Sequence, residues 1–319
     1  MEFQILYSNL TNPTLLFFVL GVVAVLVKSD LELPSSSSKF ISLYLLFSIG
    51  FKGGQELAHS SFTAEIGYSL LFGIVLASAI PVYTFFLLRR RLPVSDAAAV
   101  AASYGSVSAV TFVAAMSFLE VQKITAGGHM VAVMALMESP AIIAGVIFLM
   151  LFEREGREGS VKTVLHHAFT NGSVLLIFGS LLIGLIADTK QAEGIKPFTT
   201  DIFRGFLSIF LLDMGMVTAR RFSGFRKYGW FVTLFALVVP ALNGVAVAYL
   251  SQFITAEPGN RFIFAILAAS ASYIAVPAAM RLAAPKADPG LYIPMALGVT
   301  FPFNISVGMP LYYWVVLHG

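Results

Sequence analysis

The sequence predicts an all-α protein that crosses a membrane many times, and three observations favour this fold class. Of its 319 residues, 58% are hydrophobic and only 12% are charged, about half the charged fraction of a soluble domain. Continuous apolar runs of about 20 residues, the length of a helical membrane span, recur along the chain. These runs do not alternate with polar residues at every second position, which excludes an antiparallel β-barrel.

Ten spans are expected, because ten apolar runs lie between breaks that are charged or rich in Gly, Pro and Ser. In chain order they cover residues 13–27, 40–58, 66–88, 96–119, 128–152, 171–187, 202–219, 229–252, 260–282 and 290–316.

The basic residues orient these spans. Fourteen of the 20 Lys and Arg residues fall in the loops on one side of the membrane. The positive-inside rule makes that side cytoplasmic, so both termini are expected outside a cell inner (plasma) membrane. The largest interior loop, 153–170, is then a cytoplasmic linker at the midpoint of the chain.

Bulk composition and missing motifs exclude several other classes of protein. A net charge of +3 with scattered basic residues gives no sign of nucleic-acid binding. The absence of cysteine excludes disulfides, thiolate catalysis and Cys-bound metals. No G-x-S-x-G, H-E-x-x-H or phosphate-binding loop is present, so an enzyme is not expected and neither is a cofactor.

The two halves of the chain carry a weak internal repeat. Met134–Leu136 recurs as Met295–Leu297 at an offset of 161, and at the same offset Gly54 falls on Gly215. Ser106–Val110 and Ser272–Val276 match at an offset of 166. Five spans per half is an odd number, so the second half is expected upside down, with 1–152 and 171–319 as inverted repeats. Such repeats are characteristic of secondary transporters.

The fourth and ninth spans are expected to be broken helices. Residues 101–111 combine small residues, hydroxyls and a mid-span glycine, and residues 268–277 do the same and add Pro277. Two facing half-helix N-termini would offer free N–H groups and partial positive charge to a small anion. The hydroxyls of Ser106, Ser108, Ser270 and Ser272 could complete that cradle. The alternative is that both segments are small-residue packing seams.

Polar oxygens within two other spans suggest a cation site. Glu138 lies midway along the fifth span, where an ionisable group is costly and therefore a functional candidate. The repeat places Thr300 and Asn304 in the same region of the tenth span, and Thr111 follows the first break. Carboxylate, hydroxyl and amide oxygens are suitable ligands for Na⁺. The alternative is a protonated Glu138 that bonds to a neighbour.

Lys52 and Asp213 occupy equivalent positions in the two repeats. Residues so related can meet near the pseudo-two-fold axis, which predicts a partly buried ion pair between the second and seventh helices. The alternative is that both lie near the outer surface and never meet.

Five segments, in order, resemble the cyanobacterial sodium-dependent bicarbonate transporters. They are Ile49–Gly54, Val107–Glu120, Phe203–Met216, Ala268–Arg281 and Asp288–Ile293, and the resemblance extends through nearly the whole chain. It implies ten helices, an inverted repeat and a homotrimer in membrane lipid. It also implies a gate domain of helices 1, 2, 6 and 7, past which a core domain of helices 3–5 and 8–10 moves as an elevator.

In that family bicarbonate binds where the two broken helices cross, with sodium beside it. The matching positions are Gly105, Ser106, Val107, Ser108, Ala109 and Thr111 in the first broken helix and Ala269, Ser270, Ala271, Ser272, Tyr273 and Ala275 in the second.

Two departures from the family pattern and one retained residue bear on function. The family's second broken helix reads Ser-Ser-Ser-Asp, whereas this chain has Ser270-Ala271-Ser272-Tyr273, which leaves sodium stoichiometry and substrate open. Glu138 stands where the family has an acidic residue, which favours retained cation coupling. The central loop is shorter, so docking of the family's soluble PII-like regulator also stays open.

The sequence therefore predicts a secondary active transporter that carries bicarbonate in symport with Na⁺ by an elevator-type mechanism. Two alternatives stay open. One is a sodium- or proton-coupled carrier of another small anion or organic acid on the same fold. The other is a non-transporting membrane receptor or scaffold.

Overall fold

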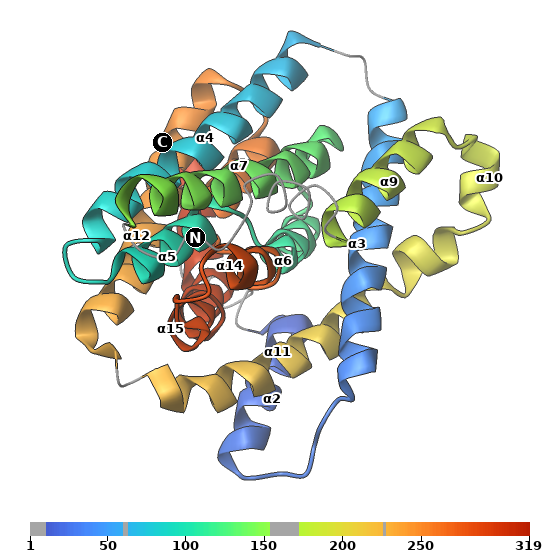
Figure 1. Cartoon of the computed structure of the whole chain (residues 1–319). Helices are drawn as coiled ribbons and strands as arrows, with labels where there is room; N and C mark the ends of the chain where they lie inside the picture. Colours follow the sequence, from blue (N-terminus) through green and yellow to red (C-terminus); the bar gives the residue numbers. More distant parts are fainter. Residues whose placement is uncertain (1–10, 60–62, 154–171, 226–227) are drawn as a thin grey trace.

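The computed structural model of the chain describes residues 11–59, 63–153, 172–225 and 228–319, and over these ranges the protein is helical with no β-strand (Figure 1). The predicted cytoplasmic linker, 153–170, lies outside the described residues except for Glu153. All-α architecture, predicted from the continuous apolar runs, is confirmed for the part of the chain that the structure describes.

Each of the ten predicted spans coincides with a helix or with consecutive helical segments. The single helices are α2 (Pro13–Leu26), α3 (Ser35–Ala58), α4 (Ala64–Leu88), α7 (His129–Phe152), α9 (Gly172–Ile186), α11 (Phe203–Phe225) and α12 (Trp230–Leu250). The interrupted ones are α5 (Val94–Gly105) with α6 (Ala109–Val121), and α13 (Pro258–Ala269) with α14 (Ala275–Ala283). Short segments α10 (Thr189–Glu193) and η1 (Pro197–Asp201) join α9 to α11, and η3 (Ser251–Phe253) follows α12.

The last span departs from the expected single helix. It consists of α15 (Pro289–Pro294), η4 (Met295–Thr300), α16 (Phe301–Phe303), η5 (Asn304–Gly308) and α17 (Met309–His318), in which η4 and η5 are π-helical. Pro302 lies between them and lacks the N–H that a regular α-helix would use, so the hydrogen-bond register changes around it.

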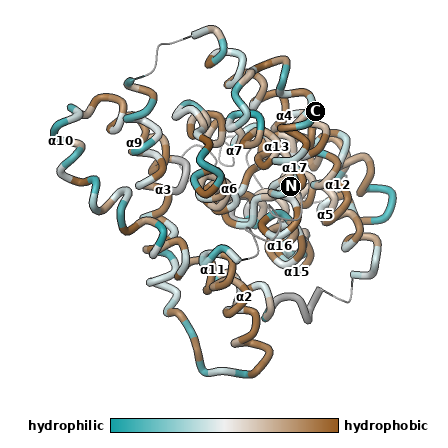
Figure 2. The backbone as a smooth tube through the Cα atoms, turned by 180° about the vertical axis from the view of Figure 1, so that it is seen from behind, coloured by the Kyte–Doolittle hydropathy of each residue, from teal (hydrophilic) through white to brown (hydrophobic). Residues whose placement is uncertain are grey.

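Among the described residues, six helical stretches are long and apolar enough to cross a membrane. They are Ala64–Leu88, Val94–Val121, His129–Phe152, Pro197–Arg220, Trp230–Phe253 and Pro289–His318. Figure 2 shows that hydrophobic residues occupy most of the helices, whereas hydrophilic residues lie mainly in the connections and in α10. Large apolar side chains such as Leu16, Leu20, Leu71 and Val75 are exposed on α2 and α4, as expected for surfaces that face lipid.

Four helices form one group, along the right side and the bottom of Figure 1. In this group α3 packs chiefly on α9, and α11 packs chiefly on α2. Both pairs approach through reciprocal glycines, because a Cβ on Gly54 or Gly184 would collide with the opposite backbone in the α3–α9 pair. Gly21 and Gly215 meet the opposite backbone in the same way in the α2–α11 pair. Small residues let membrane helices approach this closely.

The remaining helices form the second group, in which α5 and α13 are the most deeply buried elements. Nearly all side chains of both helices are buried, with α4 and α7 packed against α5, and α12 and α17 packed against α13. The ends of these two buried helices carry the breaks, so the fold brings the breaks to the interior of the protein.

Candidate transport site

The first break lies between α5 and α6. The α5 helix ends at Gly105, where any Cβ would collide with the ring of Pro81 on α4. Ser108 is the N-cap of α6, and its hydroxyl accepts a hydrogen bond from the Thr111 N–H at 3.1 Å. A serine at this position satisfies one of the free N–H groups at the start of a helix. The break expected between residues 101 and 111 is therefore present.

The second break lies between α13 and α14. The α13 helix ends at Ala269, and α14 begins at Ala275, where the Ser272 hydroxyl accepts from the Val276 N–H at 3.3 Å. Pro277 is in the first turn of α14, where a backbone N–H has no intrahelical partner to lose. The predicted break in the ninth span is therefore also present.

The two breaks contact each other through hydrogen bonds. The Ser272 N–H donates to the carbonyl oxygen of Ser103 at 2.8 Å, and the Ser108 N–H donates to the hydroxyl oxygen of Ser270 at 3.1 Å. The Ser270 hydroxyl in turn donates to the Leu267 carbonyl at 2.9 Å. Because these N–H groups already have partners, they are not free in the conformation described here.

A cavity of about 20 Å³ lies beside this crossing. Its lining includes Val107, Ser108 and Ala109 from the first break, Ser272, Tyr273 and Ala275 from the second, and Glu138 from α7. A space of this size holds about one water molecule or a bare small cation. It is too small for an anion of four heavy atoms, so such a ligand requires the crossing to open.

Several buried polar groups around the crossing have no hydrogen-bond partner among the residues that the structure describes. They are the hydroxyls of Ser103 and Ser106, one carboxylate oxygen of Glu138, and the hydroxyl of Tyr273, which lies near Ser108 without a bond of good geometry. Unpaired buried polar groups are costly, and at such a concentration they indicate a place where a polar ligand binds.

A comparison with protein families agrees with this geometry. The family described as the Na⁺-dependent bicarbonate transporter superfamily matches residues 13–317, nearly the whole chain. The chain belongs to the Na⁺-dependent bicarbonate transporter superfamily. The resemblance inferred from five sequence segments is therefore confirmed, and the protein is a transporter and not an enzyme. The comparison with individual curated proteins finds no match.

In this transporter the four residues predicted to bind Na⁺ are not gathered around one cavity. Glu138 lines the crossing cavity, but Thr300 donates to the Ala236 carbonyl at 2.8 Å and Asn304 donates to the Ala269 carbonyl at 2.7 Å. Thr111 is buried and does not line the cavity. Among described residues, no group of three or more His, Cys, Asp or Glu could hold a metal. Na⁺ does not need one, since hydroxyl and carbonyl oxygens also bind it.

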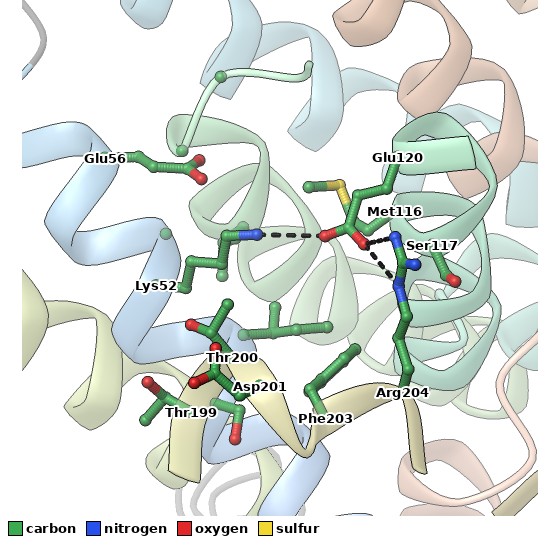
Figure 3. A pocket seen from close by; sticks show the side chains of 16 residues that line it. Lys52, Glu56, Met116, Ser117, Glu120, Thr199, Thr200, Asp201, Phe203 and Arg204 are labelled. Atoms are coloured by element: carbon green, nitrogen blue, oxygen red, sulfur yellow. Dashed lines mark hydrogen bonds and ion pairs between the residues drawn. The ribbon is translucent and has the colours of Figure 1, made fainter. Parts of the chain in front are cut away.

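The predicted Lys52–Asp213 ion pair is wrong. Asp213 accepts a hydrogen bond from the Ser38 hydroxyl at 2.6 Å, whereas Lys52 pairs with Glu120 at 3.2 Å. Equivalence in a repeat implies a similar environment but not contact. Arg204 binds the second oxygen of the same Glu120 carboxylate at 2.7 Å (Figure 3). These three side chains line a larger cavity, of about 300 Å³.

Sequence reasoning gave no role to several residues that hold the crossing in place. The hydroxyl of Tyr104 is 2.7 Å from that of Thr300, and Tyr312 donates to the side-chain oxygen of Asn304 at 3.1 Å. Asn243 in α12 donates to the Ala268 carbonyl at 3.3 Å. A polar side chain in the middle of an apolar span was the available signal for Asn243, but its partner is fixed only by tertiary packing.

Proposed function

We propose that this protein carries bicarbonate in symport with Na⁺, and that both ligands bind at the crossing of the two broken helices. The observation that carries the proposal is the meeting of two breaks and one intramembrane carboxylate at a single cavity. Membership of a Na⁺-dependent bicarbonate transporter superfamily supports the same pair of ligands.

The proposed roles follow from the chemistry of the groups present. Na⁺ would bind the carboxylate of Glu138, which has an unpaired oxygen, together with the nearby hydroxyls. Three further residues would contribute to the Na⁺ site, either as ligands or by holding the neighbouring backbone: Thr111, Thr300 and Asn304. The bicarbonate would take the N-terminal ends of α6 and α14, with hydrogen bonds from serine hydroxyls and backbone N–H groups. The substrate-site residues are Gly105, Ser106, Val107, Ser108, Ala109, Ser270, Ala271, Ser272, Tyr273 and Ala275. Each ligand then favours binding of the other, because a cation and an anion share one site.

The architecture proposed for this function is a ten-helix inverted repeat that works as an elevator. The reciprocal glycine contacts support it, because exchange of the two halves turns the α2–α11 contact into the α9–α3 contact. The gate domain would comprise α2, α3, α9 and α11, and the core domain the remaining spans. We further propose a homotrimer in the cell inner membrane with both termini outside.

A second candidate is transport of a different small monoanion or an organic acid. The specific observation that favours it is Tyr273, whose bulky side chain lines the crossing cavity and lies against Phe301 with ring centroids 6.0 Å apart. Compared with the Asp of the family pattern, a tyrosine at this position changes both the volume and the polarity of the site.

Uptake of labelled bicarbonate into proteoliposomes tests the proposal, first with an inward Na⁺ gradient and then with K⁺ in place of Na⁺. Uptake that requires Na⁺ is expected. Glu138→Gln should abolish the Na⁺ requirement or the uptake, whereas Glu193→Gln, at an exposed carboxylate on α10, should behave like the unchanged protein. Competition by unlabelled carboxylates would identify the second candidate. Folded protein without any solute flux would instead indicate a receptor or scaffold.

A further inference from the structure

The 300 Å³ cavity lies between the two groups of helices. Lys52 on α3 and Arg204 on α11 belong to the first group, and Glu120 at the end of α6 belongs to the second. Figure 3 shows the Glu120 carboxylate between the two cations, one oxygen directed to each. Arg204 contributes two N–H groups, from Nε at 3.1 Å and from Nη2 at 2.7 Å. A single carboxylate therefore connects two helices of the first group, α3 and α11, to the second group.

Two more carboxylates line the same cavity without an ion pair. Neither Glu56 nor Asp201 forms a salt bridge with any described residue, although Glu56 is within electrostatic reach of Lys52. Glu56 follows Lys52 by four residues on α3, the spacing at which side chains are neighbours on a helix. Asp201 precedes Arg204 by three residues at the start of α11. Lys52 thus has a second carboxylate on its own helix, and Arg204 has one three residues earlier in the chain, at the end of η1.

The charges argue against a permanent ligand in this cavity. Three carboxylates face two cations, so the lining has a net charge of about −1 and does not favour an anion. A net negative charge attracts a cation, but Lys52 and Arg204 already supply cationic groups within the same lining. The unpaired carboxylates are better explained as alternative partners for Lys52 and Arg204.

We propose that Glu120, Lys52 and Arg204 form a charge-exchange latch between the two helix groups, with Glu56 and Asp201 as the replacement partners. The proposal rests on the proposed elevator function, in which the two groups must slide past each other. In the state described here the latch is closed through Glu120. When α6 moves away, Lys52 pairs with Glu56 and Arg204 pairs with Asp201, so neither cation is left unpaired.

The partly exposed setting suits such an exchange. The Lys52, Glu120 and Arg204 side chains are 40%, 38% and 58% exposed, so each ion pair contributes only modestly and is broken without a large desolvation penalty. The neighbouring contact between α3 and α7 is close-packed, because a Cβ on Gly53 of α3 would meet the Val131 side chain of α7. Ser117 on α6 lines the same cavity and is buried, so its side chain becomes more accessible when α6 moves away from α3 and α11.

Modification of a single cysteine in the purified, detergent-solubilised protein tests the latch without any transport measurement. The chain has no cysteine, so Ser117→Cys provides one reporter thiol, and its rate of reaction with a charged methanethiosulfonate is measured. Adding Glu120→Gln should raise the rate about fivefold, the effect expected for the loss of two partly exposed ion pairs. Adding Glu56→Gln and Asp201→Asn together should lower the rate, because the open state loses its replacement pairs. Glu193→Gln is the matched control and should leave the rate unchanged.

The two sets of variants are expected to change the reaction rate of the reporter thiol in opposite directions, which distinguishes the latch from a local packing effect. Rates that do not change with Glu120→Gln, or that rise with the Glu56→Gln and Asp201→Asn pair, would overturn the proposal. Both of the latter positions are exposed, so this pair stays informative if Glu120→Gln fails to fold. Absence of bicarbonate uptake would contradict the proposed function but would leave the result with the reporter thiol intact.

Discussion

The contact between α3 and α9 can be tested by adding one methyl group to Gly184. A Cβ at this position would lie 3.0 Å from the carbonyl carbon of Phe51 and 3.1 Å from the Cα of Gly54, and closer still to the Phe51 oxygen. All three atoms belong to the backbone of α3, so no side-chain rotation relieves the collision. Gly179, on the same helix, has no atom within 4 Å of the position of its added Cβ.

The expected difference in stability between Gly184→Ala and Gly179→Ala follows from these two environments. Gly184→Ala forces the helices apart by on the order of 1 Å, and overpacking of this kind costs about 1–3 kcal/mol. The better helix propensity of alanine offsets up to about 1 kcal/mol of that cost. Gly179→Ala gains the same propensity without a collision. The two variants should therefore differ by about 1–3 kcal/mol in stability, with Gly184→Ala the less stable.

Thermal unfolding of the purified protein in detergent measures this difference. With an unfolding entropy of about 2.1 cal/mol/K per residue, 1 kcal/mol shifts the melting temperature of a protein of 319 residues by about 1.5 °C, so Gly184→Ala should melt about 1.5–4.5 °C below Gly179→Ala. Equal melting temperatures would refute the close approach of α3 and α9, and with it the structural support for a repeat that relates this contact to α2–α11.

Three further predictions concern the crossing. Asn304→Leu leaves the buried Ala269 carbonyl unpaired and should destabilise the protein by about 1–3 kcal/mol in thermal unfolding; an unchanged melting temperature would contradict this bond. Ser270→Ala removes a hydroxyl that is proposed to donate to bicarbonate once the crossing opens, so Na⁺-driven bicarbonate uptake should fall about tenfold, whereas full activity would place the anion elsewhere. Tyr273→Phe removes a buried hydroxyl that lacks a partner, so melting should be unchanged or slightly raised while the KM for bicarbonate rises; an unchanged KM would exclude this hydroxyl as a ligand group.

The positions of the helices could be predicted from the sequence because their signal is local. A run of apolar residues long enough to cross a bilayer is readable without knowledge of any neighbour, and the predicted and observed ends mostly agree within a few residues. The two breaks could also be predicted, the first from a glycine followed by serines and the second from serines followed by Pro277. The π-helical turns of the last span were not, since Pro302 alone does not determine how the helix accommodates it.

The partners of polar side chains could not be predicted, because tertiary packing selects them. Lys52 had several carboxylates available in the sequence, and the choice of Glu120 over Asp213 depends on where α6 ends relative to α3. Thr300 and Asn304 were correctly recognised as unusual polar residues within a span. Their hydrogen bonds run to the backbone of α12 and α13, so they support the crossing, whereas Glu138 lines its cavity.

The hydrogen bonds across the crossing also constrain how a ligand could bind there. If bicarbonate binds as proposed, it must replace the Ser103 carbonyl and the Ser270 hydroxyl as acceptors for the N–H groups of Ser272 and Ser108. The net gain is then a difference between two sets of hydrogen bonds, which is far smaller than the energy of either set. In the proposed mechanism such a site closes on itself when empty and releases its ligand readily, and Na⁺ bound beside Glu138 would shift the balance toward the occupied form.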